Sequence, residues 1–243
     1  ASDVDAAAAA DDGDDRGGGE AAGGHAPPYG MPCMLKVLEF FCKLTNPGDS
    51  PSDAAGEARR MLALALVNVV LETGGRQLSA CPALVAVIQH ELSKNLLQNS
   101  RTTNLPILSL ALRVVFNMFN SVREHMKVQL EVFFNSIHLA ESPVYEVREM
   151  ALESLLEFCR EPQLMVDIYT NYDCDVQCTN LFEDMCKSLS KNTFPTTGSL
   201  NALNLLSLEG LLAIVASLSS ACHRDKRDDG DAFTGGGGGG GGG

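Results

Sequence analysis

Several features that mark nucleic-acid-binding, membrane-spanning and secreted proteins are missing from this sequence. Lys and Arg (18) are outnumbered by Asp and Glu (31), and they form no basic cluster that could neutralise a phosphate backbone. No apolar run reaches the roughly 18–20 residues of a membrane span. The best two are 61–67, which Asn68 ends, and 203–218, which Glu209 interrupts. The N-terminus is acidic, whereas a secretion signal begins with positive charge. We therefore predict a cytosolic protein that binds no nucleic acid and associates with membranes at most peripherally.

Large apolar side chains are almost absent from both ends of the chain. Residues 1–30 consist mainly of Ala, Gly and Asp, and residues 219–243 pass through HRDKRDDGD into nine consecutive glycines. Such segments cannot bury enough apolar surface to offset the entropy lost on ordering, so we predict that both are disordered. The working domain is then predicted over residues 31–218. We interpret the chain, which starts with Ala and stops in polyglycine, as a piece of a longer polypeptide.

The eight cysteines do not form a disulfide pattern. Most of them lie within helical apolar patterns rather than in loops. Buried, reduced thiols in a cytosolic protein are the simpler explanation of that placement.

Alternation with period two, which would indicate strands, is not sustained anywhere, and the chain is predicted to be helical throughout. Proline stands at or near the start of six apolar-periodic runs, where its missing N–H needs no partner. These prolines are Pro32, Pro51, Pro82, Pro106, Pro143 and Pro162. The predicted helices cover residues 33–45, 52–73, 82–98, 105–120, 122–139, 143–160, 162–171, 176–190 and 199–218.

Two of these helices carry specific expectations. In the helix 143–160, Ser142 is predicted as the N-cap and Pro143 as the first helical residue. Its predicted outward stripe consists of Glu146, Glu149, Glu153, Glu157 and Arg160. The helix 199–218 is apolar nearly all round, so we expect it to be buried on most sides. Gly210 in its middle is expected to let a neighbouring helix approach closely.

Nine helices joined by short loops favour an all-α stack of helical hairpins of the armadillo or HEAT type, with disordered ends. No strict repeat signature fixes the period, and a compact helical bundle is the alternative. A stack of hairpins presents broad surfaces to other proteins, which favours a binding function.

The segment TNYDCDVQCTNLF (170–182) is the strongest candidate for chemistry. Cys174 and Cys178, with Cys186 further on, could ligate zinc, but zinc needs four ligands and no second pair is present. Histidines lie elsewhere with no ligand-like spacing, at His90, His125 and His138. The structural interpretation fits better: Cys178 lies on the apolar face of a helix 176–190 with Phe182, Met185 and Leu189, and Asp175 is its N-cap.

Catalysis is not favoured by this segment either. Cys174 stands between Asp173 and Asp175, which oppose thiolate formation, and no His is near in sequence. A phosphate-binding GxxxxGK[ST] loop is absent. We therefore predict no catalytic residue, no cofactor and no bound metal. A cysteine-dependent or metal-dependent enzyme centred on residues 173–186 is the less favoured alternative.

NYDCD (171–175) resembles the signature box of the HUS domain, the "homology upstream of Sec-seven" of the large Arf-GTPase guanine-nucleotide exchange factors. The resemblance covers nearly all of residues 28–218, and it looks closest to the Golgi brefeldin-resistant branch. The segments that carry it are PYGMPC (28–33), LTNPGD (44–49), VREHMKVQLEVFF (122–134), YEVREMALESL (145–155), NLFEDMCKSLSKNTFP (180–195) and LLSLEGLLAIV (205–215).

This resemblance implies an armadillo-like regulatory region that engages the family's DCB domain (dimerisation and cyclophilin binding), within one chain or between chains. It also implies control of oligomerisation through that domain, peripheral recruitment to Golgi membranes, and small GTPases of the Arf or Rab type as partners. The box residues are then expected to hold an inter-helix corner whose surface docks a neighbouring domain. They are Asn171, Tyr172, Asp173, Cys174 and Asp175.

The catalytic FRLPGE-type loop of the Sec-seven exchange domain does not occur in these 243 residues, and the DCB domain is largely missing. The resemblance therefore implies a non-catalytic regulatory fragment of an exchange factor in vesicle-mediated transport. A Mon-two-like trafficking scaffold, which lacks an exchange domain altogether, is the alternative within the same group of proteins.

Overall fold

The computed structural model describes residues 30–48, 53–136, 142–195 and 198–234, and these residues form helices joined by turns. The all-α prediction is confirmed. Disorder was predicted for residues 1–30 and 219–243. Residues 1–29 and 235–243 lie outside the described residues, whereas residues 219–234 are helical. The elements, in chain order, are α1 (Met31–Thr45), α2 (Ala54–Gly74), η1 (Gly75–Ala80), α3 (Pro82–Val87), η2 (Ile88–Leu92), α4 (Ser93–Asn99), α5 (Leu105–Val122), η3 (Arg123–His125), α6 (Lys127–Ser136), α7 (Tyr145–Cys159), α8 (Pro162–Ile168), η5 (Tyr169–Asp173), α9 (Leu181–Thr193) and α10 (Ala202–Thr234).

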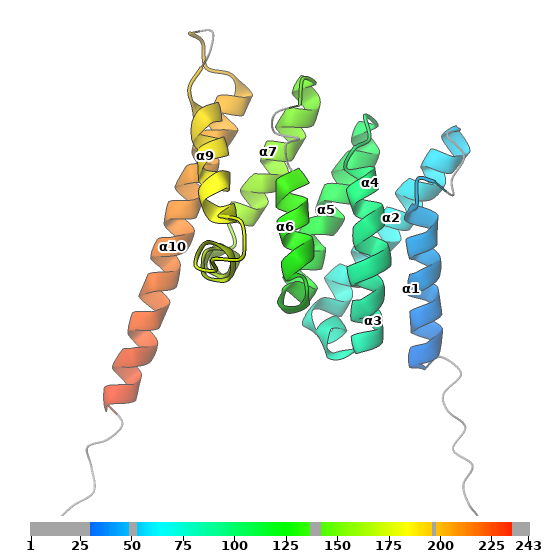
Figure 1. Ribbon diagram of the computed structural model, residues 1–243, viewed down its shortest axis with the longest axis horizontal. Coiled ribbons are helices and arrows are strands. Elements are labelled where there is room, and N and C mark those ends of the chain that lie inside the picture. Colours follow the sequence, from blue (N-terminus) through cyan, green and yellow to red (C-terminus); the bar gives the residue numbers. More distant parts are fainter. Residues whose placement is uncertain (1–29, 49–52, 137–141, 196–197, 235–243) are drawn as a thin grey trace, which may run out of the picture.

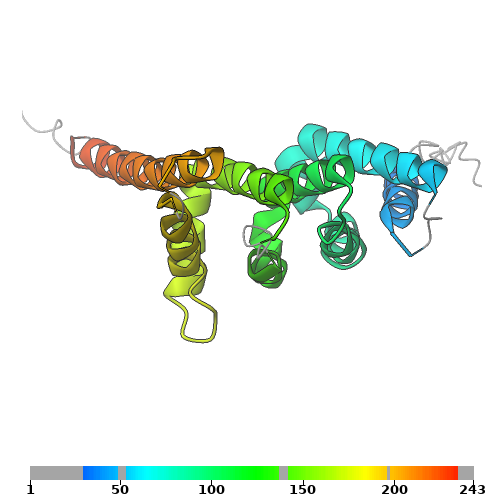
Figure 2. The ribbon, with the colours of Figure 1, turned by 90° about the horizontal axis from the view of Figure 1, so that it is seen from above.

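The helices form an elongated stack of two layers, with α1 and α10 at opposite ends (Figure 1). The first layer consists of α2, α5, α7 and α10, each packed on the next, and Figure 2 shows these four helices in one row. The second layer consists of α1, the continuous α3–η2–α4 helix, α6, and α8 with α9 (Figure 2). This order is that of stacked helical hairpins, as predicted, rather than a compact bundle.

An aromatic cluster joins the two layers at the centre of the core. Phe158 of α7 packs edge-on against Phe116 of α5, with ring centroids 5.3 Å apart, and against Phe134 of α6 at 5.5 Å. Phe119 of α5 likewise packs on Phe133 of α6 at 5.9 Å. Because Phe119 and Phe158 are fully buried, they fix the spacing of α5, α6 and α7.

Helix starts follow the sequence signals in several places. Proline occupies the first turn of α1, α3, α5 and α8, as predicted. The Asp53 carboxylate accepts a hydrogen bond from the Gly56 N–H at 2.7 Å and caps α2, and Asn104 accepts one from the Ile107 N–H and caps α5. These caps satisfy backbone donors that have no partner within the helix.

Predicted helix boundaries were wrong at several places, and three of these concern α7, α6 and α9. The helix predicted from Pro143 begins at Tyr145 with Val144 as its N-cap, because the Ser142 hydroxyl instead accepts a hydrogen bond from the Val144 N–H in a tight turn. The helix predicted over 122–139 is divided, since α5 runs to Val122, η3 follows and α6 begins at Lys127. Residues 137–139 lie outside the described residues. The third boundary, at α9, belongs to the candidate site.

The last helix differs most from its prediction. Leu189 of α9 packs against Gly210, where a Cβ atom would lie 3.2 Å from the leucine methyl carbons, so the predicted close approach is confirmed. However, α10 continues to Thr234 rather than ending at residue 218. Among residues 202–223, whose side chains the structure describes, only one side of the helix is buried. Its outward face exposes four large apolar side chains, namely Leu205, Leu208, Leu212 and Val215. It forms one end of the stack, and described helices cover only its inner side.

Two helices are long and apolar enough to cross a membrane by length and composition alone, although no sequence run was predicted to do so. They are Leu105–His125, which includes α5, and Ala202–His223 in α10. More than half of the first segment is buried in the core, as in the central helix of a folded domain. Only 22% of the second is buried, in line with the exposed face of α10.

Candidate functional site

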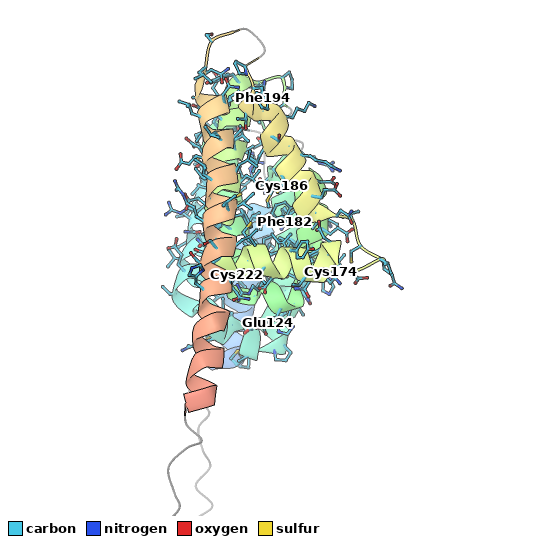
Figure 3. All side chains as sticks on the ribbon, turned by 90° about the vertical axis from the view of Figure 1, so that its left-hand side faces the viewer. Glu124, Cys174, Phe182, Cys186, Phe194 and Cys222 are labelled. Carbon is cyan, nitrogen blue, oxygen red and sulfur yellow. The ribbon has the colours of Figure 1, made fainter. Side chains whose placement is uncertain are left out.

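The five box residues form a corner between α8 and α9, which we call the box corner (Asn171–Asp175). Helix α8 continues into a single π-helical turn, η5, which is closed by a hydrogen bond from the Cys174 N–H to the Tyr169 carbonyl at 3.1 Å. Figure 3 shows α8 and η5 running away from α10 and bringing Cys174 to the outer edge of the second layer. The chain then turns back through residues 174–180 into α9.

Tyr172 anchors the box corner to α6. Its side chain is 3% exposed, and its hydroxyl donates a hydrogen bond to the Lys127 carbonyl at 2.7 Å. The Lys127 ammonium lies 5.7 Å from the centre of the tyrosine ring, within cation–π range. Burial raises the pKa of Tyr172 well above its usual value, so the phenol stays protonated and keeps its donor role. The ring is therefore a structural anchor.

Asp173 caps α9 from a distance along the chain. Its two carboxylate oxygens accept hydrogen bonds from the Phe182 and Glu183 N–H groups, at 2.9 and 3.0 Å. These are the second and third residues of α9, whose backbone donors lack partners within the helix. The negative charge also lies at the positive end of the helix dipole.

The sequence-based assignment of the cap was wrong. Asp175 was predicted as the N-cap of a helix 176–190, but α9 begins only at Leu181. Cys178 consequently precedes the helix rather than lying on its apolar face, although it still packs against the core. The preceding residues form turns because Asp175 accepts a hydrogen bond from the Gln177 N–H at 3.0 Å, which bends the chain.

Asp175 joins the box corner to α6 through an ion pair. Its carboxylate lies 2.8 Å from the Lys127 ammonium, and both side chains are partly exposed. The hydrogen bond from Lys127 and that from the Gln177 N–H lower the pKa of Asp175, and the same ion pair raises the pKa of Lys127. One turn along α6, Glu131 accepts hydrogen bonds from the Thr179 hydroxyl (2.9 Å) and N–H.

Lys127 and Glu131 are the partners that sequence reasoning missed. Both lie in the segment 122–134 that carries the family resemblance, and their spacing of four places them on one face of a helix. That spacing was the signal in the sequence from which their role could have been predicted. It indicates that this face of α6 bears charge, but it does not indicate that the loop 174–180 folds onto it.

Two box residues point their side chains away from these internal contacts. Asn171 and Cys174 are exposed, and neither side chain makes a hydrogen bond with the described residues. Asn171 lies at the edge of a cleft of about 480 Å³ between α8–η5 and η3–α6, which we call the box cleft. An ion pair spans this cleft, from Arg123 of η3 to Asp167 of α8 at 3.1 Å. The box corner therefore presents a polar cleft with an unpaired amide at its rim.

Five of the eight thiols are buried or partly buried, whereas Cys33, Cys174 and Cys222 are exposed. Within the described ranges, no three His, Cys, Asp or Glu side chains gather closely enough to hold a metal ion, while His138 lies outside those ranges. Burial raises the pKa of Cys186, and it raises that of Cys42 and of Cys159 to about 12, which disfavours thiolates there.

Comparison with known proteins gives consistent matches. The model of the Mon2/Sec7/BIG1-like HUS domain matches residues 30–181. ARF guanine-nucleotide exchange factor GNOM of Arabidopsis thaliana is 37% identical over 188 residues, which cover 72% of this chain and 13% of the relative.

Two further relatives, one named for brefeldin A resistance and one for inhibition by brefeldin A, differ in their identity to this chain. The Golgi-specific brefeldin A-resistance guanine nucleotide exchange factor 1 homolog of Caenorhabditis elegans is 40% identical over 185 residues, 72% of this chain and 9% of the relative. Brefeldin A-inhibited guanine nucleotide-exchange protein 1 of Rattus norvegicus is 29% identical over 163 residues, 64% of this chain and 9% of the relative. The chain thus spans about an eighth or less of the length of these curated relatives.

Proposed function

Because this chain belongs to the HUS-domain family of the large Arf guanine-nucleotide exchange factors, on the side of the Golgi brefeldin-resistant branch, we propose that it is a non-catalytic regulatory part of such a factor. Its role is to make the inter-domain and partner contacts that control Arf activation in vesicle-mediated transport. The match is confined to the HUS region, and no Sec-seven exchange motif is evident in the chain.

The observation that carries the proposal is that some side chains of the box corner make internal contacts while another is left free to contact a partner. Tyr172, Asp173 and Asp175 are engaged internally and hold the corner rigid. Asn171 remains at the rim of the box cleft with its amide unused. A rigid corner that leaves one polar group unpaired costs little to order when a partner binds, which suits a docking site.

The partner proposed for the box cleft is the family's DCB domain, within the same chain or from another copy of the full-length protein. A DCB contact between copies would make the protein an oligomer. Small GTPases of the Arf or Rab type are proposed as further partners of the assembled region. The site of action is proposed as the cytoplasmic surface of Golgi membranes, with peripheral association.

Calorimetric titration of this chain with a purified DCB domain of the family tests the docking proposal. Asn171→Ala is expected to weaken binding about tenfold, since interface groups that matter cost more than about 1 kcal/mol on truncation. The melting temperature should stay unchanged, because the Asn171 side chain makes no hydrogen bond with any residue that the structure describes. Gln98→Ala, which removes another exposed amide on α4, is the matched control.

If both Asn171→Ala and Asp173→Ala bound the DCB domain with wild-type affinity, the box corner would not be part of the docking surface. Equal weakening by Gln98→Ala would also contradict the proposal, because the effect would then not be specific to the box cleft.

A second candidate is a Mon-two-like trafficking scaffold, which the description of the matched family model also names. The two candidates differ in what the gene encodes beyond residue 243. A Sec-seven domain there supports the exchange factor, whereas unrelated helices support the scaffold. The docking role of the box corner is the same in both.

A further inference from the structure

A second hollow lies on the other layer of the molecule, on the face that points away from the box corner. It has a volume of about 580 Å³ and runs across α5 and α7, with α2 at one end and α10 at the other. Apart from Arg160, the C-cap residue that follows α7, every residue that lines it belongs to these four helices of the first layer. We call it the acidic groove and define it by its charged residues, which are Glu72, Arg113, Glu153, Glu157, Arg160 and Glu209.

The floor of the acidic groove is apolar and firmly supported. Leu112 and Phe116 of α5, Met150 of α7 and Leu206 of α10 line it. Phe116 is only partly buried, and its ring rests edge-on against Phe158 in the central aromatic cluster. The floor therefore cannot collapse when the groove is empty, and it offers partly exposed apolar surface to another molecule.

Negative charge predominates at the rim. Four glutamates face two arginines, so the groove carries a net charge of −2. Arg160 is shared between Glu157, at 2.7 Å, and Glu209, while Arg113 lies 3.8 Å from Glu72. Glu153 is exposed and has no cation within ion-pair distance among the described residues. The box cleft differs, because there Arg123 and Lys127 balance Glu124 and Asp167.

We propose that the acidic groove docks a basic amphipathic helix supplied by another protein or domain. Apolar side chains of that helix pack on Phe116 and Met150, and a flanking Lys or Arg pairs with Glu153. An apolar floor with a rim of one charge is the surface that an amphipathic helix with flanking charges of the opposite sign complements. An anionic membrane is disfavoured because its surface would face the same carboxylates. This function is separate from docking at the box cleft, since the two sites lie on different layers.

Three synthetic helical peptides test the proposal, with one shared leucine face and with Lys, Gln or Glu at the flanking positions. Fluorescence anisotropy titrations of the whole chain should rank their affinities Lys, then Gln, then Glu. The affinities of the Lys and Glu peptides are expected to differ at least about tenfold. Binding of the Lys peptide should weaken as salt is added.

Glu153→Lys is expected to weaken binding of the Lys peptide about fivefold, as removal and reversal of one exposed charge would. Because Glu153 is exposed and unpaired, this variant should melt as the wild type does. Glu91→Lys is the matched control: it makes the same charge change at an exposed position of η2 in the second layer, and it should bind normally. Asn171→Ala should bind the peptide normally too, which separates this proposal from the role of the box cleft.

Three results would each overturn the proposal. The first is that the affinities of the three peptides do not depend on their charge. The second is that Glu91→Lys and Glu153→Lys lose the same affinity for the Lys peptide. The third is that the chain binds phosphatidylserine-containing vesicles but not the Lys peptide.

Discussion

The box corner and the acidic groove use their polar side chains in opposite ways. At the box corner, the Tyr172 hydroxyl and both oxygens of Asp173 bond to backbone groups of other elements. In the acidic groove, the two arginines pair with Glu72, Glu157 and Glu209, whereas Glu153 has no ion-pair partner in the described chain. Polar groups that are used internally hold the shape of the molecule, and those left over are available to other molecules.

The backbone explains this difference. The box corner leads into residues 174–180, which belong to no regular helix, and the backbone groups of this segment and of the start of α9 need partners from side chains. The acidic groove is built on four regular helices whose backbone groups satisfy one another. Substitutions at the box corner should therefore act mainly on stability, and those in the groove mainly on binding.

The largest expected effect is that of Tyr172→Ala. Loss of this buried ring should lower the free energy of unfolding by about 3 kcal/mol, because it leaves a cavity between α8–η5 and α6. Tyr172→Phe should cost about 1 kcal/mol, since it removes only the hydrogen bond to the Lys127 carbonyl. Urea unfolding followed by circular dichroism measures both values.

The counterpart in the acidic groove is Met150→Ala. Met150 is only half-buried at the groove floor, so we expect a cost of about 1 kcal/mol, below that of a fully buried methionine. A cost as large as that of Tyr172→Ala would show that the groove is as structural as the box corner, and the contrast between the two regions would then fail.

Asp173→Ala is expected to have a smaller effect than Tyr172→Ala. Loss of a helix cap costs about 1–2 kcal/mol. The damage should be local: hydrogen exchange should quicken at the Phe182 and Glu183 amides, which lose their acceptor. Glu153→Ala should change the unfolding free energy by less than about 0.5 kcal/mol, as an unpaired surface residue does. Equal losses in the two variants would contradict the contrast.

The sequence predicted the elements better than it predicted their contacts. In the described ranges, the nine predicted helices (with α3–η2–α4 taken as one), four of the proline-led starts and the close approach at Gly210 follow from local rules, because propensity, proline geometry and glycine size act within a few residues. The cap of α9 was misplaced because Asp173 reaches it from eight residues before Leu181, whereas the capping rule looks at the adjacent residue.

The exposed face of α10 could not be predicted for a related reason. An apolar pattern shows that a surface favours burial, but the neighbours that cover it depend on the tertiary arrangement. Leu205 and Leu212 lie on the side away from α7, α8 and α9, where the described chain supplies no further helix. For the same reason, the acidic groove could not be located in advance. The stripe that includes Glu153 was predicted to face outward, but its neighbours on α5 and α10 were not known.

The smallest expected effect is the pH dependence that Asp175 contributes. Its pKa in the folded protein is lowered from 3.8 by the hydrogen bond from Lys127 and the N–H of Gln177. Its contribution to stability should therefore be fully present above the unfolded pKa and should disappear as the pH falls through the folded value.

Urea unfolding at steps from about pH 7 to about pH 3 measures this contribution. The gap in unfolding free energy between wild type and Asp175→Asn should narrow toward the acid end. If the Asp175→Asn gap stays flat, the ion pair with Lys127 does not help to hold the box corner, and only the buried contacts of Tyr172 and Asp173 distinguish it from the acidic groove.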